Sequence, residues 1–241
     1  MKTTTLALLG LLPLLACAPK GSRPHDLSEA QHEAEAARQE NAAAAHAEEY
    51  DPTAEAAVTR CNPSWSGHSY PICWTSVTNP TQEHLRAAER ARKAASAHRA
   101  ASSALAAAEA QACRGIAPDD RDISPFDHTA DIASVESHTL SRGGKGGVSS
   151  LVDGATITFL AVPGLTAEWL QRVVDCHLAR NAALGHDVLE MPDCPLVPKG
   201  AQAQVKSTGS GFAVTVTSTE PHAGPEILSR ARRLVPSAAA R

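Results

Sequence analysis

Alanine dominates the first half of this 241-residue chain, and aromatic residues make up only 3% of the whole. Because each alanine buries little apolar surface, this half cannot build a large close-packed core. A narrow, alanine-rich seam recurs there at heptad-like spacing: Leu85, Ala88, Ala91 or Arg92, Ala95, Ser102 and Leu105. Such seams let two helices pair closely but stabilise little per contact. We therefore expect an antiparallel helical hairpin over residues 26–115.

Caps and prolines place the ends of the two expected helices. Asp26 or Ser28 can cap the first helix, and glutamates follow in its opening turns, where the helix dipole favours negative charge. Pro52 ends that helix, because proline clashes with the preceding helical turn. Pro80 suits the first turn of the second helix, which continues to about Cys113.

The segment between the helices contains two cysteines that can clamp the hairpin. A disulfide between Cys61 and Cys73 would close a loop of about 13 residues and contribute roughly 3 kcal/mol through loop entropy. The alternative is a zinc site made by Cys61, His68 and Cys73. That set lacks an obvious fourth ligand and the short spacing typical of zinc-binding cysteines. We favour the disulfide.

Histidines recur along both expected helices. The residue numbers of His32 and His98 have the sum 130, and so do those of His46 and His84. Facing residues of an antiparallel pair share a constant sum, so the spacing predicts two cross-helix histidine pairs. Such pairs could bind a soft divalent ion or sense acid pH, because imidazole titrates near neutrality. The alternative interpretation is a row of solvated histidines on a polar flank.

After a polar linker at 116–131, in which Ile123 and Phe126 can dock on the next domain, the pattern becomes alternating. Strands are expected at 132–140, 155–162, 201–206 and 212–217, and helices at 166–184 and 223–235. The order ββαββα over residues 132–236, followed by a tail at 237–241, predicts a small two-layer sandwich and an α+β fold class. The glycine-rich stretch 142–147 lacks the frame of a phosphate-binding loop and is interpreted as a flexible loop.

Two further cysteines flank a segment of this domain that has no expected helix or strand. A disulfide between Cys176 and Cys194 would pin residues 185–200 to the preceding helix, with Cys113 as the odd thiol. The alternative is a copper or zinc site with soft ligands, drawn from Cys176, His177, His186, Met191 and Cys194. Adjacent helical residues point about 100° apart, which disfavours joint ligation by Cys176 and His177.

The N-terminus has the features of an export signal. Lys2 supplies a positive charge before an apolar run over 6–16, which is about half the ~20 residues needed to span a bilayer. The tetrapeptide Leu14-Leu15-Ala16-Cys17 resembles the lipobox of bacterial lipoproteins. The resemblance implies cleavage after residue 16, lipidation of Cys17 and a lipidated tether over 17–25. The alternative is a secreted protein cut after Ala16.

The export signal and the lipobox predict where the protein lies and what it contacts. Two or three acyl chains hold a protein at a membrane in effect permanently, so we expect a cell-envelope protein, on the outer rather than the inner membrane, facing the periplasm or the cell surface. Export to an oxidising compartment favours disulfides. The net charge of −4 argues against a nucleic-acid partner. The expected partners are the membrane, through the lipid, and another envelope protein.

Several motifs resemble a group of delta-proteobacterial lipoproteins: Asn79-Pro80-Thr81, His84-Leu85, Cys113-Arg-Gly-Ile, Ser124-Pro125-Phe126, Cys176-His177-Leu-Ala and Cys194-Pro195-Leu196. The resemblance implies no activity. Glu48 and Glu49 are adjacent carboxylates on a solvated helix, and no constellation for acid–base or nucleophilic catalysis is evident. We expect a lipid-anchored structural or protein-binding protein that is not an enzyme and needs no cofactor, the alternative being a periplasmic metal-binding or metal-sensing lipoprotein.

Overall fold

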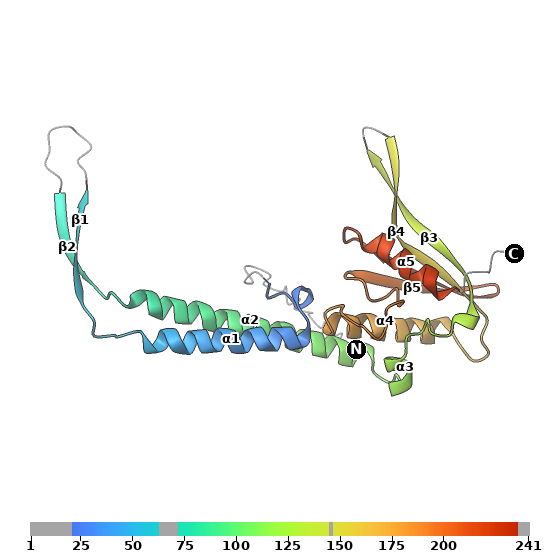
Figure 1. The fold of residues 1–241 in the computed structure, drawn as a ribbon, viewed down its shortest axis with the longest axis horizontal. Helices are drawn as coiled ribbons and strands as arrows, with labels where there is room; N and C mark the ends of the chain where they lie inside the picture. The colour runs from blue at the N-terminus through green and yellow to red at the C-terminus, as the bar shows by residue number, and fades with distance from the viewer. Residues whose placement is uncertain (1–20, 63–71, 145–146, 236–241) are drawn as a thin grey trace, which may run out of the picture.

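A computed structural model describes residues 21–62, 72–144 and 147–235, and these form a mixed α+β structure, in agreement with the expected class. The described part contains five α-helices and two antiparallel sheets. Figure 1 shows an elongated molecule, with the smaller sheet at one end and the larger sheet at the other. None of the helices in these ranges combines the length and the apolar character that crossing a membrane requires.

Helices α1 (Glu29–Glu48) and α2 (Gln82–Ala112) lie side by side (Figure 1). Ser28 caps α1: its hydroxyl accepts a hydrogen bond from the Gln31 backbone, and the Gln31 side chain accepts one from the Ser28 backbone. Along the seam of α2, the spacing between successive buried residues alternates between three and four: Ala88, Ala91, Ala95, His98, Ser102 and Leu105. The facing seam of α1 contains His32, Ala36 and Ala43. Small side chains thus bring the two helices together, as the heptad spacing predicts.

Strands β1 (Ala56–Asn62) and β2 (Ile72–Thr78) form a two-stranded antiparallel sheet, called the arm below. Cys61 and Cys73 are directly opposite each other and form a disulfide, so the favoured pairing of these cysteines is present in the structure. Thr59 and Thr75 share a hydrogen bond of 2.9 Å across the same sheet. The sequence pattern indicated a turn here and missed the strands.

The second sheet has the strand order β3-β4-β6-β5, with every neighbouring pair antiparallel. Its strands are β3 (Ile132–Gly144), β4 (Gly147–Leu160), β5 (Ala201–Thr208) and β6 (Gly211–Ser218). Helices α4 (Ala167–Ala183) and α5 (Ala223–Leu234) supply buried side chains to one core with this sheet. The strand residues of that core pair in register: Ala155 with Val216, Ile157 with Val214, and Phe159 with Phe212. The opposite face, which includes Thr156 and Thr215, is more exposed.

Strands β3 and β4 continue past the sheet as a ribbon (Figure 1). The glycine-rich stretch that we interpreted as a flexible loop is largely within this ribbon, because β3 reaches Gly144 and β4 begins at Gly147. Residues 145 and 146 lie outside the described ranges. Leu140 and Leu151 are opposite each other on the ribbon, and both are exposed.

The segment 116–131 is more ordered than the expected polar linker. It contains α3 (Pro118–Asp122) and a 3₁₀ turn, Thr129–Asp131. Phe126 is fully buried, with its ring centroid 5.8 Å from that of Phe159, whereas Ile123 stays half exposed. Of these two candidate docking residues, only Phe126 enters the core.

The predicted disulfide between Cys176 and Cys194 is wrong, because Cys176 bonds Cys113 instead. Cys176 lies on α4 where that helix packs against the end of α2, and it is fully buried there. Cys194 carries a free thiol and lies in the core with Leu196 and the strand residues. The disulfide therefore joins α2 to α4. Residues 185–200 are held instead by packing and by hydrogen bonds from Arg230 and Arg233 of α5 to the Pro192 carbonyl.

Candidate functional site

Both predicted histidine pairs are present between α1 and α2. The ring centroids of His32 and His98 are 5.3 Å apart, and those of His46 and His84 are 5.7 Å apart. The first pair, called the proximal pair below, lies near the start of α1. The second pair lies near the end of α1, beside the arm. The two pairs differ in burial and in the groups that surround them.

The proximal pair is buried and satisfied by hydrogen bonds. His32 is fully buried, and its Nδ1 lies 3.0 Å from the Nδ1 of His98. The Nε2 of His32 is 3.4 Å from the carbonyl oxygen of Pro24, which can only accept. Because this carbonyl can only accept, a hydrogen bond here requires the proton on Nε2 of His32, and its Nδ1 can then accept the Nδ1–H of His98. Burial and the neighbouring His32 lower the pKa of His98.

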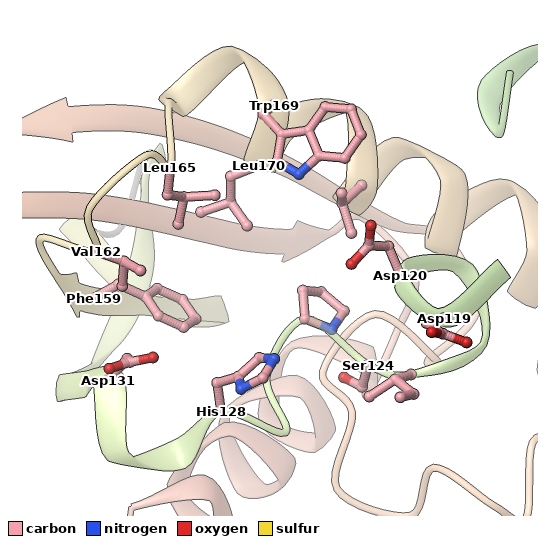
Figure 2. A pocket seen from close by; sticks show the side chains of 13 residues that line it. Asp119, Asp120, Ser124, His128, Asp131, Phe159, Val162, Leu165, Trp169 and Leu170 are labelled. Atoms are coloured by element: carbon pink, nitrogen blue, oxygen red, sulfur yellow. The ribbon is translucent and has the colours of Figure 1, made fainter. Parts of the chain in front are cut away.

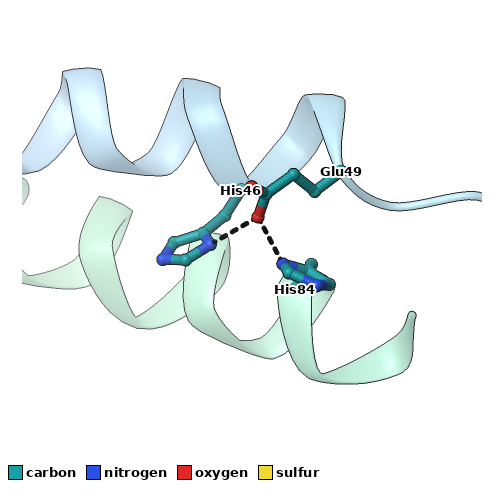
Figure 3. A group of neighbouring side chains, drawn as sticks. All are labelled: His46, Glu49 and His84. Carbon is teal, nitrogen blue, oxygen red and sulfur yellow. Dashed lines mark ion pairs between the residues drawn. The ribbon is translucent and has the colours of Figure 1, made fainter. Parts of the chain in front are cut away.

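Three side chains converge at the other pair, and we call His46, Glu49 and His84 the distal triad (Figure 3). Glu49 caps the C-terminal end of α1, three residues after His46. Its Oε2 lies 3.4 Å from the Nδ1 of His46 and 2.5 Å from the Nδ1 of His84. One potential ligand atom from each residue lies within 4.8 Å of the other two. The Nδ1 of His46 is buried and has no hydrogen-bond partner. The sequence interpretation treated Glu49 as a solvated carboxylate, although its spacing of three from His46 was the available signal.

Hydrogen bonds fasten the two helices together next to the distal triad. The Asp51 backbone N–H donates to the Thr81 hydroxyl (3.0 Å), and the Asn79 side chain donates to the Asp51 carbonyl (2.7 Å). Thr81 also donates to the Asp51 carbonyl (3.1 Å). These three residues, called the hinge below, lie where the helices pass into the arm.

A separate cavity of about 520 Å³ opens between α3, α4 and the end of β4. Figure 2 shows Trp169 and Leu165 on one side of it, and His128 and Ser124 on the other. Carboxylates lie at its margin: Asp119, Asp120 and Asp131. The Ser124 hydroxyl accepts a hydrogen bond from the Phe126 backbone (3.3 Å), so it supports the turn. The acidic and aromatic groups that line this cavity suit an apolar or cationic ligand.

The remaining candidate ligands do not gather into a site. His177 is 3.0 Å from the backbone carbonyl oxygen of Asp120, and His186 is 2.9 Å from that of Val197. Burial lowers the pKa of both histidines. The sulfur of Cys176 belongs to a disulfide, so the copper or zinc set proposed around it is not available.

Two predicted sites involve residues beyond the described ranges. The zinc alternative between the helices loses both of its sulfur ligands to the Cys61–Cys73 disulfide, and His68 lies outside the described residues. Cys17, the expected lipidation site, also lies outside them.

Comparisons of this chain with protein-family models, with curated proteins and with solved structures find no match. The geometry of the described residues therefore carries the functional argument. It singles out the distal triad, the hinge and the arm.

Proposed function

We propose that this protein is a lipid-anchored cell-envelope protein that binds another protein through the arm and acts without catalysis. The observation that carries the proposal is the exposure of apolar side chains on a sheet that pairs with no other described strand. On β2, Trp74 is 50% exposed and Val77 is 66% exposed. Figure 1 shows the arm standing away from the helices at the end of the hairpin.

The arm has the form of a recognition element. An isolated two-stranded hairpin is at best marginally stable in water, and this one is fastened by the Cys61–Cys73 disulfide and by the Thr59–Thr75 hydrogen bond. The outer edges of β1 and β2 have unpaired backbone groups, which can pair with an added strand. A partner strand would satisfy that edge and cover Trp74 or Val77.

The proposed anchor places the arm far from the membrane. Ser28 lies against Gly185 of the second domain, so the start of the described chain is beside that domain. A lipid on Cys17 is only four residues before Gly21, and this tether spans at most about 14 Å. The second domain would then lie near the membrane surface. The 20 residues of α1 carry the chain about 30 Å towards the arm.

Labelling with a radioactive fatty acid tests the anchor. The full chain should take up label and fractionate with membranes, whereas Cys17→Ser should do neither. Label retained by Cys17→Ser would contradict the anchor.

Site-specific photo-crosslinking in intact cells tests the arm. A photoreactive residue at Val77 should give one discrete cross-linked product, and one at exposed Lys206 of β5 should not give that product. Identical products from both positions would contradict a binding role of the arm.

A further inference from the structure

We infer that the distal triad is a site for one divalent transition-metal ion, of the zinc, copper or nickel type, and that the ion locks the hinge at the base of the arm. This inference goes beyond the proposed protein-binding role, because it assigns a ligand to residues outside the strands of the arm. It rests on the donor set, the spacing of the ligand atoms and one buried nitrogen that makes no hydrogen bond.

The donor set fits these ions. His46 and His84 each offer an imidazole nitrogen, and Glu49 offers a carboxylate oxygen. Imidazole nitrogen suits zinc, copper and nickel, and a set of two histidines and one carboxylate is an established form of zinc site. Glu49 also supplies one negative charge against the two positive charges of the ion. Calcium and magnesium prefer sites built from oxygen atoms, so they are not the expected occupants.

The spacing of the ligand atoms is close to what a metal requires. With bonds of 2.0–2.1 Å, the ligands of a tetrahedral zinc ion lie about 3.3 Å from one another. The oxygen of Glu49 is already 3.4 Å from the nitrogen of His46. It is 2.5 Å from the nitrogen of His84, so that ring would retreat by less than about 1 Å. Three protein ligands leave a fourth position for water or for a group of a partner.

A buried nitrogen supplies an independent observation. The Nδ1 of His46 has no hydrogen-bond partner, and an unsatisfied buried polar atom costs free energy. A metal bond to this nitrogen removes that cost. In the proximal pair, by contrast, the corresponding nitrogens of His32 and His98 satisfy each other, and Pro24 accepts from His32. The proximal pair thus serves as an internal comparison that should bind no metal.

The position of the site gives the ion a mechanical effect. His46 is in the last turn of α1, Glu49 is the residue that caps its C-terminal end, and His84 is in the first turn of α2. The hinge residues Asp51, Asn79 and Thr81 follow directly and already join the two helices by hydrogen bonds. An ion that bridges the helices here adds bonds at the point where the arm leaves them. Metal loading should therefore restrict motion at the base of the arm.

Isothermal titration of the full chain with ZnCl₂ and NiCl₂ tests the site. We expect one ion per chain with a dissociation constant on the order of micromolar or tighter. His84→Ala and Glu49→Gln should each weaken binding by about tenfold or more, whereas His25→Ala, which removes an exposed histidine elsewhere, should not. Binding weaker than millimolar, or binding that both triad variants retain, would overturn the inference.

Two further measurements separate metal ligation from folding. Circular dichroism without metal should give the same helix content for Glu49→Gln as for the parent chain, because glutamine keeps the shape of the side chain. Hydrogen exchange should slow at residues 79–84 on adding Zn²⁺ to the parent chain and not to Glu49→Gln. Exchange that slows equally in both would overturn the inference. Loss of metal binding with retained cross-linking at Val77 would leave the proposed function intact.

Discussion

At the scale of single residues, the proximal pair makes folding sensitive to acid. The Nδ1 atoms of His32 and His98 lie 3.0 Å apart and can hold only one proton between them. Burial lowers the pKa of His98, and the neighbouring His32 lowers it further. The negative charges of Glu35 and Asp26 raise the pKa of His98, whereas the positive charge of Arg38 lowers it. Glu35 stays ionised in mild acid, because its hydrogen bond from Arg38 lowers its pKa to about 2.

The sign of the pH dependence follows from this lowered pKa. The unfolded chain takes up a proton at His98 near pH 6.5, and the folded chain does so only at lower pH, so the free energy of unfolding falls as pH drops below about 6.5. His177 and His186, whose pKa values burial also lowers, act in the same direction. Urea unfolding should therefore show that the free energy of unfolding falls less between pH 7.5 and pH 5 in His98→Gln than in the parent chain. An equal loss in both would contradict this role, and His128→Gln is the control.

A second prediction at this scale concerns Cys194. Its thiol is buried, and burial raises its pKa, so little reactive thiolate forms. Iodoacetamide at pH 8 should leave Cys194 unmodified in the native protein. In urea without reductant, peptide mass spectrometry should find Cys194 alkylated, with Cys61, Cys73, Cys113 and Cys176 protected. Alkylated Cys113 would instead favour the pairing first expected from sequence.

Sequence reasoning located residues best where a simple geometric rule applied. The sum of residue numbers found the His46–His84 pair because two antiparallel helices keep a constant register. The same reasoning missed Glu49, because its spacing of three from His46 indicates a site only once His84 of the facing helix is placed beside both residues. It also chose the wrong partner for Cys176, because the contact between α2 and α4 joins segments 63 residues apart.

At the scale of elements, two disulfides act on different parts of the structure. Cys113–Cys176 joins α2 to α4, and their sequence separation of 63 closes a long loop. Ion pairs lie beside it, because Arg180 contacts both Glu109 and Asp122. Cys61–Cys73 closes a loop within the arm alone. The strands of the arm were harder to predict than those of the larger sheet, because both are short and Pro63 and Pro71, which adjoin them in the sequence, favour a turn.

Removing the two disulfides should therefore have unequal effects. Loop entropy gives about 4 kcal/mol for Cys113–Cys176, so the double variant C113S/C176S should lose about that much free energy of unfolding. The double variant C61S/C73S should leave the main transition nearly unchanged, since the arm pairs only with itself. Urea titration followed by circular dichroism at 222 nm measures both. Equal losses in the two variants would show that the arm folds together with the rest.

At the scale of the whole molecule, the hairpin separates the two sheets. Figure 1 shows the arm at one end of α1 and α2 and the larger sheet near the other end. The contacts of Ser28 with Gly185 and of Cys113 with Cys176 hold the hairpin against the second domain. The mixed α+β class was predictable from the change of period along the chain. The placement of the hairpin on the domain was not, because it depends on contacts distant in sequence.

This arrangement predicts different distances from a membrane for the two sheets, if Cys17 carries the lipid. An environment-sensitive fluorophore introduced at Lys206 of β5 should be quenched strongly by a lipid-phase quencher in vesicles that contain the acylated protein. The same fluorophore at Thr75 of the arm should be quenched weakly, because α1 alone spans about 30 Å. The protein with Cys17→Ser gives the baseline for both positions. Equal quenching at Lys206 and Thr75 would mean that the hairpin lies flat along the membrane, which would contradict an arm that reaches outward.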